Sequence, residues 1–367
     1  MKLEDIYKKA LQLENLNSKE ALYIYRNAPT TELMFVANDL RQHHVPGNTV
    51  SWQIDRNINI TNVCISACKF CNFHCKLNDT DKSYTTTLDD YIPKIEELYR
   101  RGGSQVLLQG GLHPKYGLDF YSNLFRSLKQ HFPDLKLHAL GPPEIAHIAR
   151  LEKMNYHDVL IHLIDAGLDS LPGAGAEILA DRVRKILSPA KPNVQAWLDV
   201  MLEAHKLNLA TSATMMFGHI ETPEERIEHF LKIRDLQNER PNGTYGFLAF
   251  ICWPVQSKGT PLAEQFDIKP VTATEYVRMV ALSRIVLNNI KHIQASWLSV
   301  GKDVAELCLH GGANDFGSIM IEENVMSSAG AHNSFDAKSI QAAIKEAGFE
   351  PWLRNQRYEK IEYKPQN

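Results

Sequence analysis

The chain has 367 residues, with a hydrophobic content of 44% and a charged content of 23%, which are the values of a soluble globular protein that can bury a sizeable core. The net charge of −3 and the even spread of Lys and Arg argue against a basic surface that would bind nucleic acid or an anionic membrane. Apolar runs stay short of the roughly 20 residues that a membrane-spanning helix needs, and the first residues show no secretory signal pattern.

The first part of the chain is expected to be a helical extension of the main domain. Asn17 with Glu20 three residues later has the pattern of a capping box, and Thr31 is expected to cap a further helix. Pro46 falls in a turn that ends this section. We interpret residues 1–48 as helices that pack on the domain that follows.

Strands and helices alternate over residues 49–325. Apolar and polar side chains alternate over residues 52–60, which predicts a first strand. The later strands are expected at residues 105–109, 136–139, 169–171, 210–217, 246–251, 292–297 and 317–321. The helices are expected at residues 88–100, 120–131, 143–154, 156–165, 176–186, 196–206, 224–238, 274–289 and 303–310. Eight strands in this alternation predict an α/β fold, a (β/α)8 barrel of the TIM type.

The end of the barrel is the least clearly marked part of the pattern. Because the last two strands are weak, a six-stranded open barrel with appended elements is the structural alternative. Residues 326–367 are expected to pack on the barrel as a C-terminal helix, over residues 336–347, and a charged tail that frays.

Glycine and proline gather at one end of the predicted strands. The segments are residues 110–114, 141–144, 172–177, 218–221 and 253–254. Such residues are typical of places where the backbone must approach a ligand closely. Since a barrel carries its active site at the carboxyl ends of its strands, we expect the site there.

Four of the six cysteines lie close together directly after the first predicted strand. Cys64, Cys68 and Cys71 form a C-x3-C-x2-C pattern, and Cys75 follows. In the cytoplasm, where we place this protein, clustered thiols are more often ligands or catalysts than disulfides. One interpretation is a [4Fe–4S] cluster that three cysteines hold with one iron left open. The alternative is a binding module stabilised by a closed zinc or four-thiolate site, with Cys75 as fourth ligand.

With Phe70 just before the third cysteine, this pattern resembles the signature of radical S-adenosylmethionine (SAM) enzymes. The resemblance implies two cofactors, a [4Fe–4S] cluster held by Cys64, Cys68 and Cys71, and SAM, whose methionine binds the open iron. Reduction of the cluster would then split SAM and release a 5′-deoxyadenosyl radical. The cofactors carry the difficult chemistry, while the protein positions SAM and the substrate and excludes water.

The same resemblance suggests which residues contact SAM. Gly110 and Gly111 match the family's glycine motif, whose backbone receives the methionine amino group. Glu177 would hold the ribose hydroxyls, and Arg182 would fork onto the methionine carboxylate. Phe70 would offer its backbone to the adenine. An ordinary turn at the glycines and solvated helix-start charges at Glu177 and Arg182 are the structural alternatives.

From about residue 57 to residue 358 the chain is similar to the radical enzymes of the menaquinone pathway that act on futalosine-type nucleosides. The segments that resemble both enzymes of that pair are residues 168–173, 176–179 and 214–222. The segments that favour the cyclising enzyme over the aminofutalosine synthases are residues 109–111, 138–144, 294–297 and 311–325. Another radical SAM enzyme that forms carbon–carbon bonds remains a further alternative.

The resemblance implies an intramolecular cyclisation of dehypoxanthine futalosine. The adenosyl radical would remove a hydrogen atom from ribose C4′, and the resulting radical would add to the benzoate ring. Rearomatisation then requires the loss of one proton and one electron, and the electron can return to the cluster. The expected partners are this small nucleoside and an electron donor such as flavodoxin or ferredoxin.

The cyclisation needs a proton acceptor within hydrogen-bond reach of the ring. His113, His219 and Asp315 are expected at suitable strand ends, although a histidine at such a place more often has a structural role. The chain also departs from the family pattern at three places. Ala174 stands where glycine is usual, Gly141 where serine is usual, and His74-Cys75 where Tyr-Arg is usual.

Overall fold

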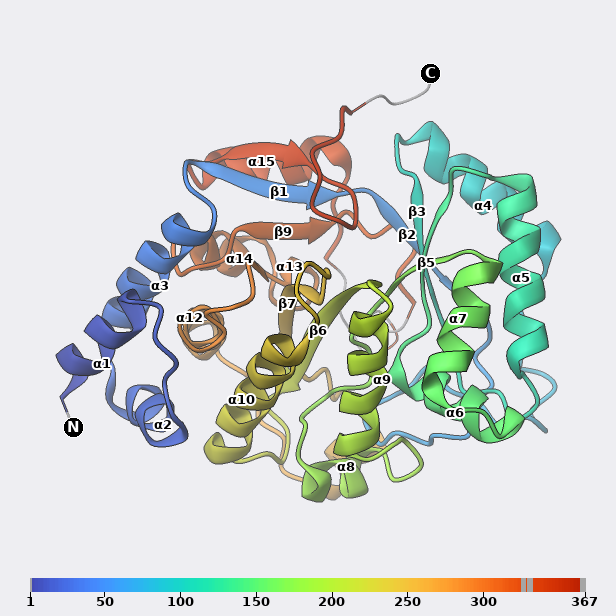
Figure 1. Ribbon diagram of the computed structural model, residues 1–367, viewed down its shortest axis with the longest axis horizontal. Coiled ribbons are helices and arrows are strands. Elements are labelled where there is room, and N and C mark those ends of the chain that lie inside the picture. The colour runs from blue at the N-terminus through green and yellow to red at the C-terminus, as the bar shows by residue number, and fades with distance from the viewer. Residues whose placement is uncertain (1, 325–327, 329–332, 364–367) are drawn as a thin grey trace.

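The computed structural model describes residues 2–324, 328 and 333–363. Its strands are β1 (Thr49–Gln53), β2 (Asp55–Asn59), β3 (Gln105–Gln109), β4 (Lys136–Ala139), β5 (Leu168–Leu171), β6 (Ala210–Phe217), β7 (Phe247–Pro254), β8 (His292–Gln294), β9 (Asp315–Ser318) and β10 (Glu350–Leu353). All neighbours pair in parallel, in the order β10-β1-β9-β8-β7-β6-β5-β4-β3-β2 (Figure 1).

The first predicted strand is divided at Ile54 into two halves that pair on opposite sides. β1 pairs with β9 and β10, whereas β2 pairs with β3. The chain after β9 also continues along β2, because Ile321 donates its backbone N–H to the carbonyl of Asp55 (3.0 Å). Both ends of the strand series therefore meet on one stretch of chain. The eight expected strands are all present, so the TIM-type α/β fold is confirmed and the six-stranded alternative is wrong.

Helices cover the outside of the curved sheet (Figure 1). They are α1 (Leu3–Leu11), α2 (Ser18–Asn27), α3 (Thr30–His44), α4 (Leu88–Arg100), α5 (Leu118–His131), α6 (Pro142–Glu152), α7 (Tyr156–Ala166), α8 (Asp181–Leu187), α9 (Val194–Lys206), α10 (Pro223–Glu239), α11 (Pro261–Gln265), α12 (Ala273–Val286), α13 (Trp297–Val300), α14 (Lys302–Leu309) and α15 (Ala337–Glu346).

Most predicted helices begin and end within a few residues of their expected bounds. α10 is typical, because Thr222 and Glu225 form a capping box and Pro223 occupies the first turn. The helix expected at residues 176–186 begins only at Asp181. Glu177 has φ +41°, in the left-handed region, and this conformation is incompatible with a helix there.

The N-terminal helices pack beside the barrel, where α3 lies along α12. The capping box of Asn17 and Glu20 is confirmed. The expected cap at Thr31 is wrong, because α3 begins at Thr30 and Pro29 occupies the N-cap in an extended conformation. Arg278 of α12 donates to the backbone carbonyl of Ala28 (2.8 Å), which fastens this extension to the barrel.

The C-terminal segment packs on the barrel through a further strand and the residues that follow it. β10 adds to the outer edge of β1, and Arg354 after it is buried. Arg354 contacts Asp315 (2.6 Å) and Gln53 (2.8 Å), and Tyr358 stacks on His292. The side chains of residues 350–358 therefore fill the amino-terminal end of the barrel, while the end of the tail that was expected to fray includes residues 364–367, which lie outside the described residues.

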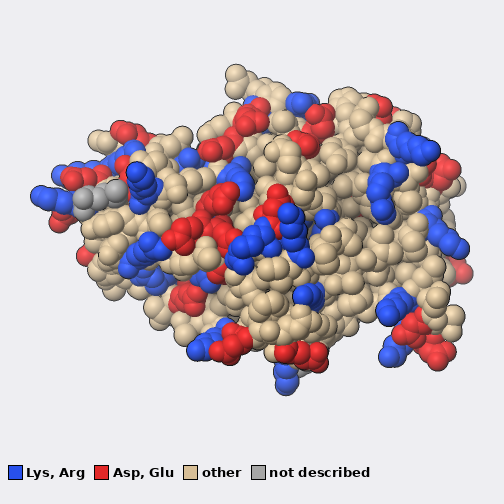
Figure 2. Space-filling view, turned by 90° about the horizontal axis from the view of Figure 1, so that it is seen from below, with Lys and Arg blue, Asp and Glu red and all other residues tan. Residues whose placement is uncertain are grey.

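Charges of both signs are mixed on the face of the molecule that carries α6 and α8, at the bottom of Figure 1. Figure 2 shows Lys and Arg interspersed with Asp and Glu over the described part of this face, with wide uncharged areas between them. Among the described residues, none of the helices combines the length and the apolar character needed to cross a membrane.

Candidate active site

The cysteine loop follows β2 and is tied to two neighbouring segments. Cys64 donates its backbone N–H to the carbonyl of Cys75 (3.1 Å), and Cys75 donates its own to the carbonyl of Asn62 (2.9 Å). The sulfur of Cys64 accepts from the backbone N–H groups of Ser66 (3.4 Å) and Leu112 (3.3 Å). These two N–H donors fix the position of the Cys64 sulfur at the end of β3.

The other two thiols of the pattern lie in different environments. Cys68 is buried, and burial raises its pKa to about 11, although nearby Lys191 lowers it in part. Burial also raises the pKa of Cys71, but hydrogen bonds from His74 and from the backbone of Phe73 outweigh it and leave that pKa below its ordinary value. The thiolate form is therefore more accessible at Cys71 than at Cys68.

The donor set fits an iron–sulfur cluster better than one zinc ion. Among the described residues, no three His, Cys, Asp or Glu side chains come close enough to hold a single metal ion. A four-iron cluster spreads its cysteine ligands farther apart than one ion does. Two buried serine hydroxyls beside these thiols, Ser66 and Ser188, have no hydrogen-bond partner among the described residues, as expected where a bound group completes the site.

Cys75 is separated from the three thiols by its own contacts. It is buried, and its sulfur is hydrogen-bonded to the side-chain oxygen of Asn62 (3.3 Å). Its backbone forms a parallel bridge with Val63. Cys75 therefore fastens the cysteine loop through its backbone and its sulfur.

Gly110 and Gly111 lie where β3 meets the cysteine loop. A Cβ on Gly110 would approach the carbonyl oxygen of Thr61 to 2.8 Å, and a Cβ on Gly111 would overlap the backbone of Val63. Gly111 donates its N–H to the carbonyl of Thr61 (2.7 Å). Only glycine allows this approach, so the pair fixes the cysteine loop against the end of β3.

Glu177 lies in a buried charged group next to Cys68. Its carboxylate binds Lys191 (2.7 Å) and Arg184 (3.4 Å). Burial raises its pKa, but these two cations outweigh burial and keep the pKa below its ordinary value. The ammonium of Lys191 also lies over the ring of Phe70, 5.6 Å from its centroid. The structure thus brings the predicted residues Glu177 and Phe70 together with Cys68.

Lys191 is the member of this group that sequence reasoning missed. It stands in the loop between α8 and α9, outside any recognisable motif. It nevertheless packs against Glu177, with a side chain that is only 15% exposed. The proline on its C-terminal side is the only local signal, and that signal predicts a turn rather than a site.

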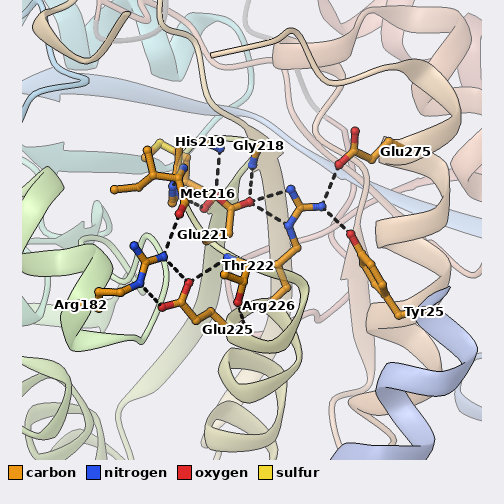
Figure 3. A network of polar contacts seen from close by, with 11 residues as sticks. Tyr25, Arg182, Met216, Gly218, His219, Glu221, Thr222, Glu225, Arg226 and Glu275 are labelled. Carbon is orange, nitrogen blue, oxygen red and sulfur yellow. Dashed lines mark hydrogen bonds and ion pairs between the residues drawn. The ribbon is translucent and has the colours of Figure 1, made fainter. Parts of the chain in front are cut away.

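Arg182 points away from this group. Its side chain is 50% exposed and binds both carboxylate oxygens of Glu225 (2.8 and 2.7 Å). It also donates to the carbonyl of Ile220 (2.8 Å), as Figure 3 shows. The structure therefore does not bring Arg182 together with Glu177 or with the three thiols.

The loop after β6 is fixed by a second buried network, drawn in Figure 3. Glu221 accepts from the backbone N–H groups of Gly218 (2.6 Å) and His219 (2.9 Å). Arg226 donates to the same carboxylate (2.8 Å) and to Tyr25 of α2 (3.0 Å). Burial raises the pKa of Glu221, but His219 and Arg226 outweigh it and lower the pKa to about 2.

Both ring nitrogens of His219 make contacts within this loop. Its Nε2 contacts the carbonyl of Met216 (3.0 Å), and its Nδ1 lies 2.7 Å from Oε2 of Glu221 and 2.8 Å from the backbone nitrogen of Ile220. The ring therefore has a structural role and leaves no free acceptor for a substrate proton.

His113 and Asp315 are also engaged. Nδ1 of His113 accepts the backbone N–H of Lys115 (3.2 Å), so the neutral ring carries its proton on Nε2 and can donate there. Asp315 was expected at the carboxyl end of a strand, and this is wrong, because β9 begins at Asp315. It lies at the amino-terminal end of the barrel, where it pairs with Arg354.

Glu144 is a second residue that sequence reasoning left without a role. It is buried in the first turn of α6, and its Oε2 has no hydrogen-bond partner among the described residues. Burial raises its pKa to about 7.

A Cβ on Gly141 would lie 2.9 Å from the Cβ of Ala174 and 3.3 Å from Oε2 of Glu144. The two departures from the family pattern therefore accommodate each other, since the methyl group of Ala174 occupies space that glycine leaves at 141.

Two family models match the chain. Residues 58–233 match the radical SAM superfamily, and residues 244–367 match the CofH/MqnC C-terminal region. The chain is 41% identical to the cyclic dehypoxanthine futalosine synthase of Streptomyces coelicolor, over 98% of this chain and 89% of that protein. It is 37% identical to the 5-amino-6-(D-ribitylamino)uracil–L-tyrosine 4-hydroxyphenyl transferase 2 of Methanosarcina barkeri, over 98% of this chain and 92% of that protein.

Solved structures with the same fold include methylornithine synthase and the hydrogenase maturase HydG. Methylornithine synthase aligns with a TM-score of 0.70 and 18% identity, over 96% of this chain and 98% of that chain. HydG aligns with a TM-score of 0.71 and 14% identity, over 97% of this chain and 76% of that chain. At these identities the comparison establishes the fold.

Proposed function

This chain belongs to the radical SAM enzyme family that includes the cyclic dehypoxanthine futalosine synthases, and from this premise we propose that it cyclises dehypoxanthine futalosine in menaquinone biosynthesis. The observation that carries the proposal is the similarity to the Streptomyces coelicolor enzyme along nearly the whole chain. The placement of three thiols after the first barrel strand supports it. The new carbon–carbon bond would join ribose C4′ to the benzoate ring.

The family uses a [4Fe–4S] cluster and SAM, and we propose that Cys64, Cys68 and Cys71 hold the cluster in this chain. When bound, the two cofactors supply a 5′-deoxyadenosyl radical that removes a hydrogen atom from the substrate. The backbone N–H donors to Cys64 support its role as a ligand. Gly110 and Gly111 keep the cysteine loop against β3 and leave their backbone open to the methionine amino group.

We propose that Lys191 binds the methionine carboxylate in place of the predicted Arg182. Lys191 is a buried cation beside Cys68 and Phe70, whereas Arg182 is held by Glu225. Glu177 would orient Lys191 and accept hydrogen bonds from the ribose hydroxyls, since its pKa lies below the ordinary value and it is ionised at neutral pH. Phe70 remains the proposed contact to the adenine.

The histidines and Asp315 are poorly suited to accept the proton that leaves the ring. The nitrogens of His219 are engaged in its loop, and Asp315 pairs with Arg354 away from the site. We therefore propose His113 as a hydrogen-bond donor, through Nε2, to an acceptor on the bound ligand. Its lowered pKa, which burial causes, keeps the ring neutral.

We further propose a barrel unit over residues 49–325 that carries the site, with residues 1–48 and 326–367 packed on it. The contacts that support this division are the hydrogen bonds of Tyr25 and Ala28 with barrel residues and the ion pair of Arg354 with Asp315. A cytoplasmic location and a flavodoxin or ferredoxin as electron donor are proposed because the thiols and the cluster need a reducing compartment.

The test is an anaerobic assay with the reconstituted, reduced enzyme, SAM and dehypoxanthine futalosine. The expected result is 5′-deoxyadenosine together with a cyclised nucleoside that is two hydrogens lighter, measured by mass spectrometry. Cleavage of SAM with the nucleoside unchanged would contradict the proposal.

The second candidate function is transfer of the tyrosine side chain. It is favoured by the relatives from Methanosarcina species, which carry the transferase name at 36–38% identity. Supplying L-tyrosine and 5-amino-6-(D-ribitylamino)uracil in the same assay separates the two functions. A coupled product from this pair, with no cyclised nucleoside, would replace the first proposal by the second.

A further inference from the structure

The side chains of β2 alternate between the outer helices and the interior of the barrel. The guanidinium of Arg56 binds the carboxylate of Glu97 in α4 (2.6 Å), so Arg56 faces the helices. Because successive side chains of a strand point to opposite faces, Asn57 faces the interior. Its backbone N–H donates to the carbonyl of Ile321 (3.1 Å), so the main chain is paired here.

The carboxamide of Asn57 lacks the partner that a buried polar group normally has. Asn57 is 4% exposed, and its Oδ1 is buried without a hydrogen bond to any of the described residues. Leaving a buried acceptor unpaired costs stability. We therefore expect a bound state in which a donor reaches this oxygen.

The interior above this carboxamide is open along two other strands. In β3, Leu108 is completely buried, whereas Leu107 and Gln109 on the opposite face are partly exposed. In β7, the ring of Phe250 packs on α10, and Ile251 on the opposite face is partly exposed. The inward faces of these strands therefore border a space that their side chains do not fill.

Toward the amino ends of the strands, the interior is closed. Asp55 and Gln105 stand opposite each other in the layer below Asn57. The hydroxyl of Ser318 donates to the carboxylate of Asp55, and Nε2 of Gln105 donates to Gln356 (3.1 Å). Although Oε1 of Gln105 is also unpaired, this layer separates it from the open part of the barrel.

Two further carboxamides border the open space. Gln109 is the last residue of β3, and Gln294 is the last residue of β8. A Cβ on Gly317 would approach Nε2 of Gln294 to 2.7 Å, so the Gln294 side chain lies along the neighbouring strand β9. Within the described part of the chain, neither glutamine side chain makes a hydrogen bond. Both amides are thus available to a ligand.

We propose that Asn57, Gln109 and Gln294 bind the hydroxyl groups of the substrate's five-carbon sugar chain, with Asn57 at the base of this site. A carboxamide offers donors and an acceptor without charge, which suits neutral hydroxyls. The inference rests on the proposed function. It also covers the second candidate, because dehypoxanthine futalosine carries a ribose and 5-amino-6-(D-ribitylamino)uracil carries a ribityl chain.

The experiment measures binding to the full-length, reconstituted enzyme with SAM, without a reductant, so that no turnover occurs. Anaerobic calorimetry gives the Kd of dehypoxanthine futalosine and of 5-amino-6-(D-ribitylamino)uracil for the wild type and for Asn57→Leu. Leucine keeps the branched shape of the side chain and removes its polar atoms. For the compound that the wild type binds, Asn57→Leu is expected to raise the Kd roughly three- to tenfold.

Analogues that each lack one hydroxyl of the sugar chain identify a direct contact. Loss of the hydroxyl that Asn57 binds should raise the Kd of the wild type. The same loss should have little further effect on Asn57→Leu, because the contact is already absent. The Tm of Asn57→Leu without the sugar compound should not fall, since the variant removes an unpaired buried group.

Two further variants complete the comparison. Gln237 in α10 bonds at both ends of its carboxamide to the backbone of Phe247 (3.0 and 2.7 Å). Gln237→Leu is therefore expected to lower the Tm and to keep the wild-type Kd. Gln294→Leu changes the proposed site on another strand and should raise the Kd, and it decides the question if Asn57→Leu does not fold.

Wild-type Kd values in Asn57→Leu and Gln294→Leu overturn the inference. So does an equal effect of every missing hydroxyl on the wild type and on Asn57→Leu, because packing would then account for the loss. Binding of neither compound by the wild type contradicts both the inference and the proposed function. Binding of the uracil compound alone, weakened by the same variants, replaces the proposed function and supports this inference.

Discussion

At the scale of single residues, the four clustered cysteines divide into three thiols of the signature pattern and one that holds the loop. Cys64 accepts two backbone N–H groups, hydrogen bonds from His74 and Phe73 lower the pKa of Cys71, and Cys68 is buried beside a lysine. Cys75 bonds to Asn62 through both its backbone and its sulfur. The hydrogen bonds distinguish Cys75 from the other three cysteines. The spacing C-x3-C-x2-C-x3-C does not, because Cys75 follows Cys71 at the same interval at which Cys68 follows Cys64.

This division predicts different outcomes for alanine variants. Cys64→Ala, Cys68→Ala and Cys71→Ala should each abolish SAM cleavage, because two thiolates hold the cluster too weakly. Cys75→Ala should retain the cluster and most of the activity, with some loss of stability. Iron content and the yield of 5′-deoxyadenosine are the measurements. Loss of the cluster in Cys75→Ala would show that the ligand set is misassigned.

Glu144 leads to a prediction about pH. Because burial raises its pKa from 4.5 to about 7, the folded protein holds this proton more tightly than the unfolded chain does. The proton on Glu144 therefore contributes to the free energy of unfolding fully below pH 4.5, and this contribution is lost as the pH rises through 7. The loss amounts to about 3 kcal/mol. Glutamine at position 144 does not titrate, so Glu144→Gln lacks this dependence. The free energy of unfolding of Glu144→Gln minus that of the wild type should therefore increase between pH 5 and pH 8. Urea unfolding at both pH values measures it, and a constant difference would contradict it.

Neither Lys191 nor Glu144 could be assigned a role from the sequence. Both are charged residues in or next to loops, which a sequence pattern places on the surface. Their burial depends on how two separate loops fold over them. The cysteine pattern and the glycine pair were predictable because their spacing reflects local backbone requirements, namely three ligands on one loop and a close approach of β3.

At the scale of elements, the loops after β4 and β5 interlock through very small side chains. Gly141 faces the methyl group of Ala174, and Gly175 leaves no room for a Cβ against Pro143. This contact sets the distance between the two loops and thereby the position of Glu177 in the second loop.

A serine at position 141 should disturb this contact. Gly141→Ser places its Cβ too close to Ala174 and is expected to lower the free energy of unfolding by about 1–3 kcal/mol. Ala174→Gly in the same protein should recover most of the loss, because it removes the methyl group that causes the overlap. A double-mutant cycle of unfolding free energies measures the coupling. Additive effects of the two changes would show that the loops do not compete for this space.

The elements themselves were largely predictable, and the errors have physical causes. The alternation of strand-like and helix-like segments located all eight barrel strands. A period of two marked only the first of them, because strands such as β6 are buried along their whole length. β10 was missed because Glu350–Leu353 is a short segment with proline at the edge of the sheet. α8 begins later than predicted because the left-handed conformation of Glu177 depends on its buried ion pairs, which no local pattern encodes.

At the scale of the whole molecule, the C-terminal segment closes the end of the barrel that lies opposite the site. Arg354 pairs with Asp315 and Gln53, and its guanidinium lies 4.0 Å from the ring centroid of Tyr358. The side chains of Arg354 and Asp315 are 4% and 0% exposed. The pair therefore links the last part of the chain to β9 and β1 in a region that water does not reach.

Removing one partner of this pair should be costly. Arg354→Met leaves the Asp315 carboxylate buried without its cation, and the expected loss in the free energy of unfolding is about 3–5 kcal/mol. Arg354→Met combined with Asp315→Asn should lose less, because no uncompensated charge remains. Thermal and denaturant unfolding of the reconstituted proteins provide the measurement. An equal or greater loss in the double variant would contradict the electrostatic explanation.

The division of the first barrel strand at Ile54 has a consequence for how the protein is made. β2 finds its neighbour β3 within the next fifty residues or so, but β1 pairs only with β9 and β10. While the chain is still growing on the ribosome, β1 therefore has two open edges until almost all of the protein has been synthesised. Contacts between such distant segments form slowly, and an unpaired strand invites association with other chains. The nascent protein depends on its last strand to protect its first.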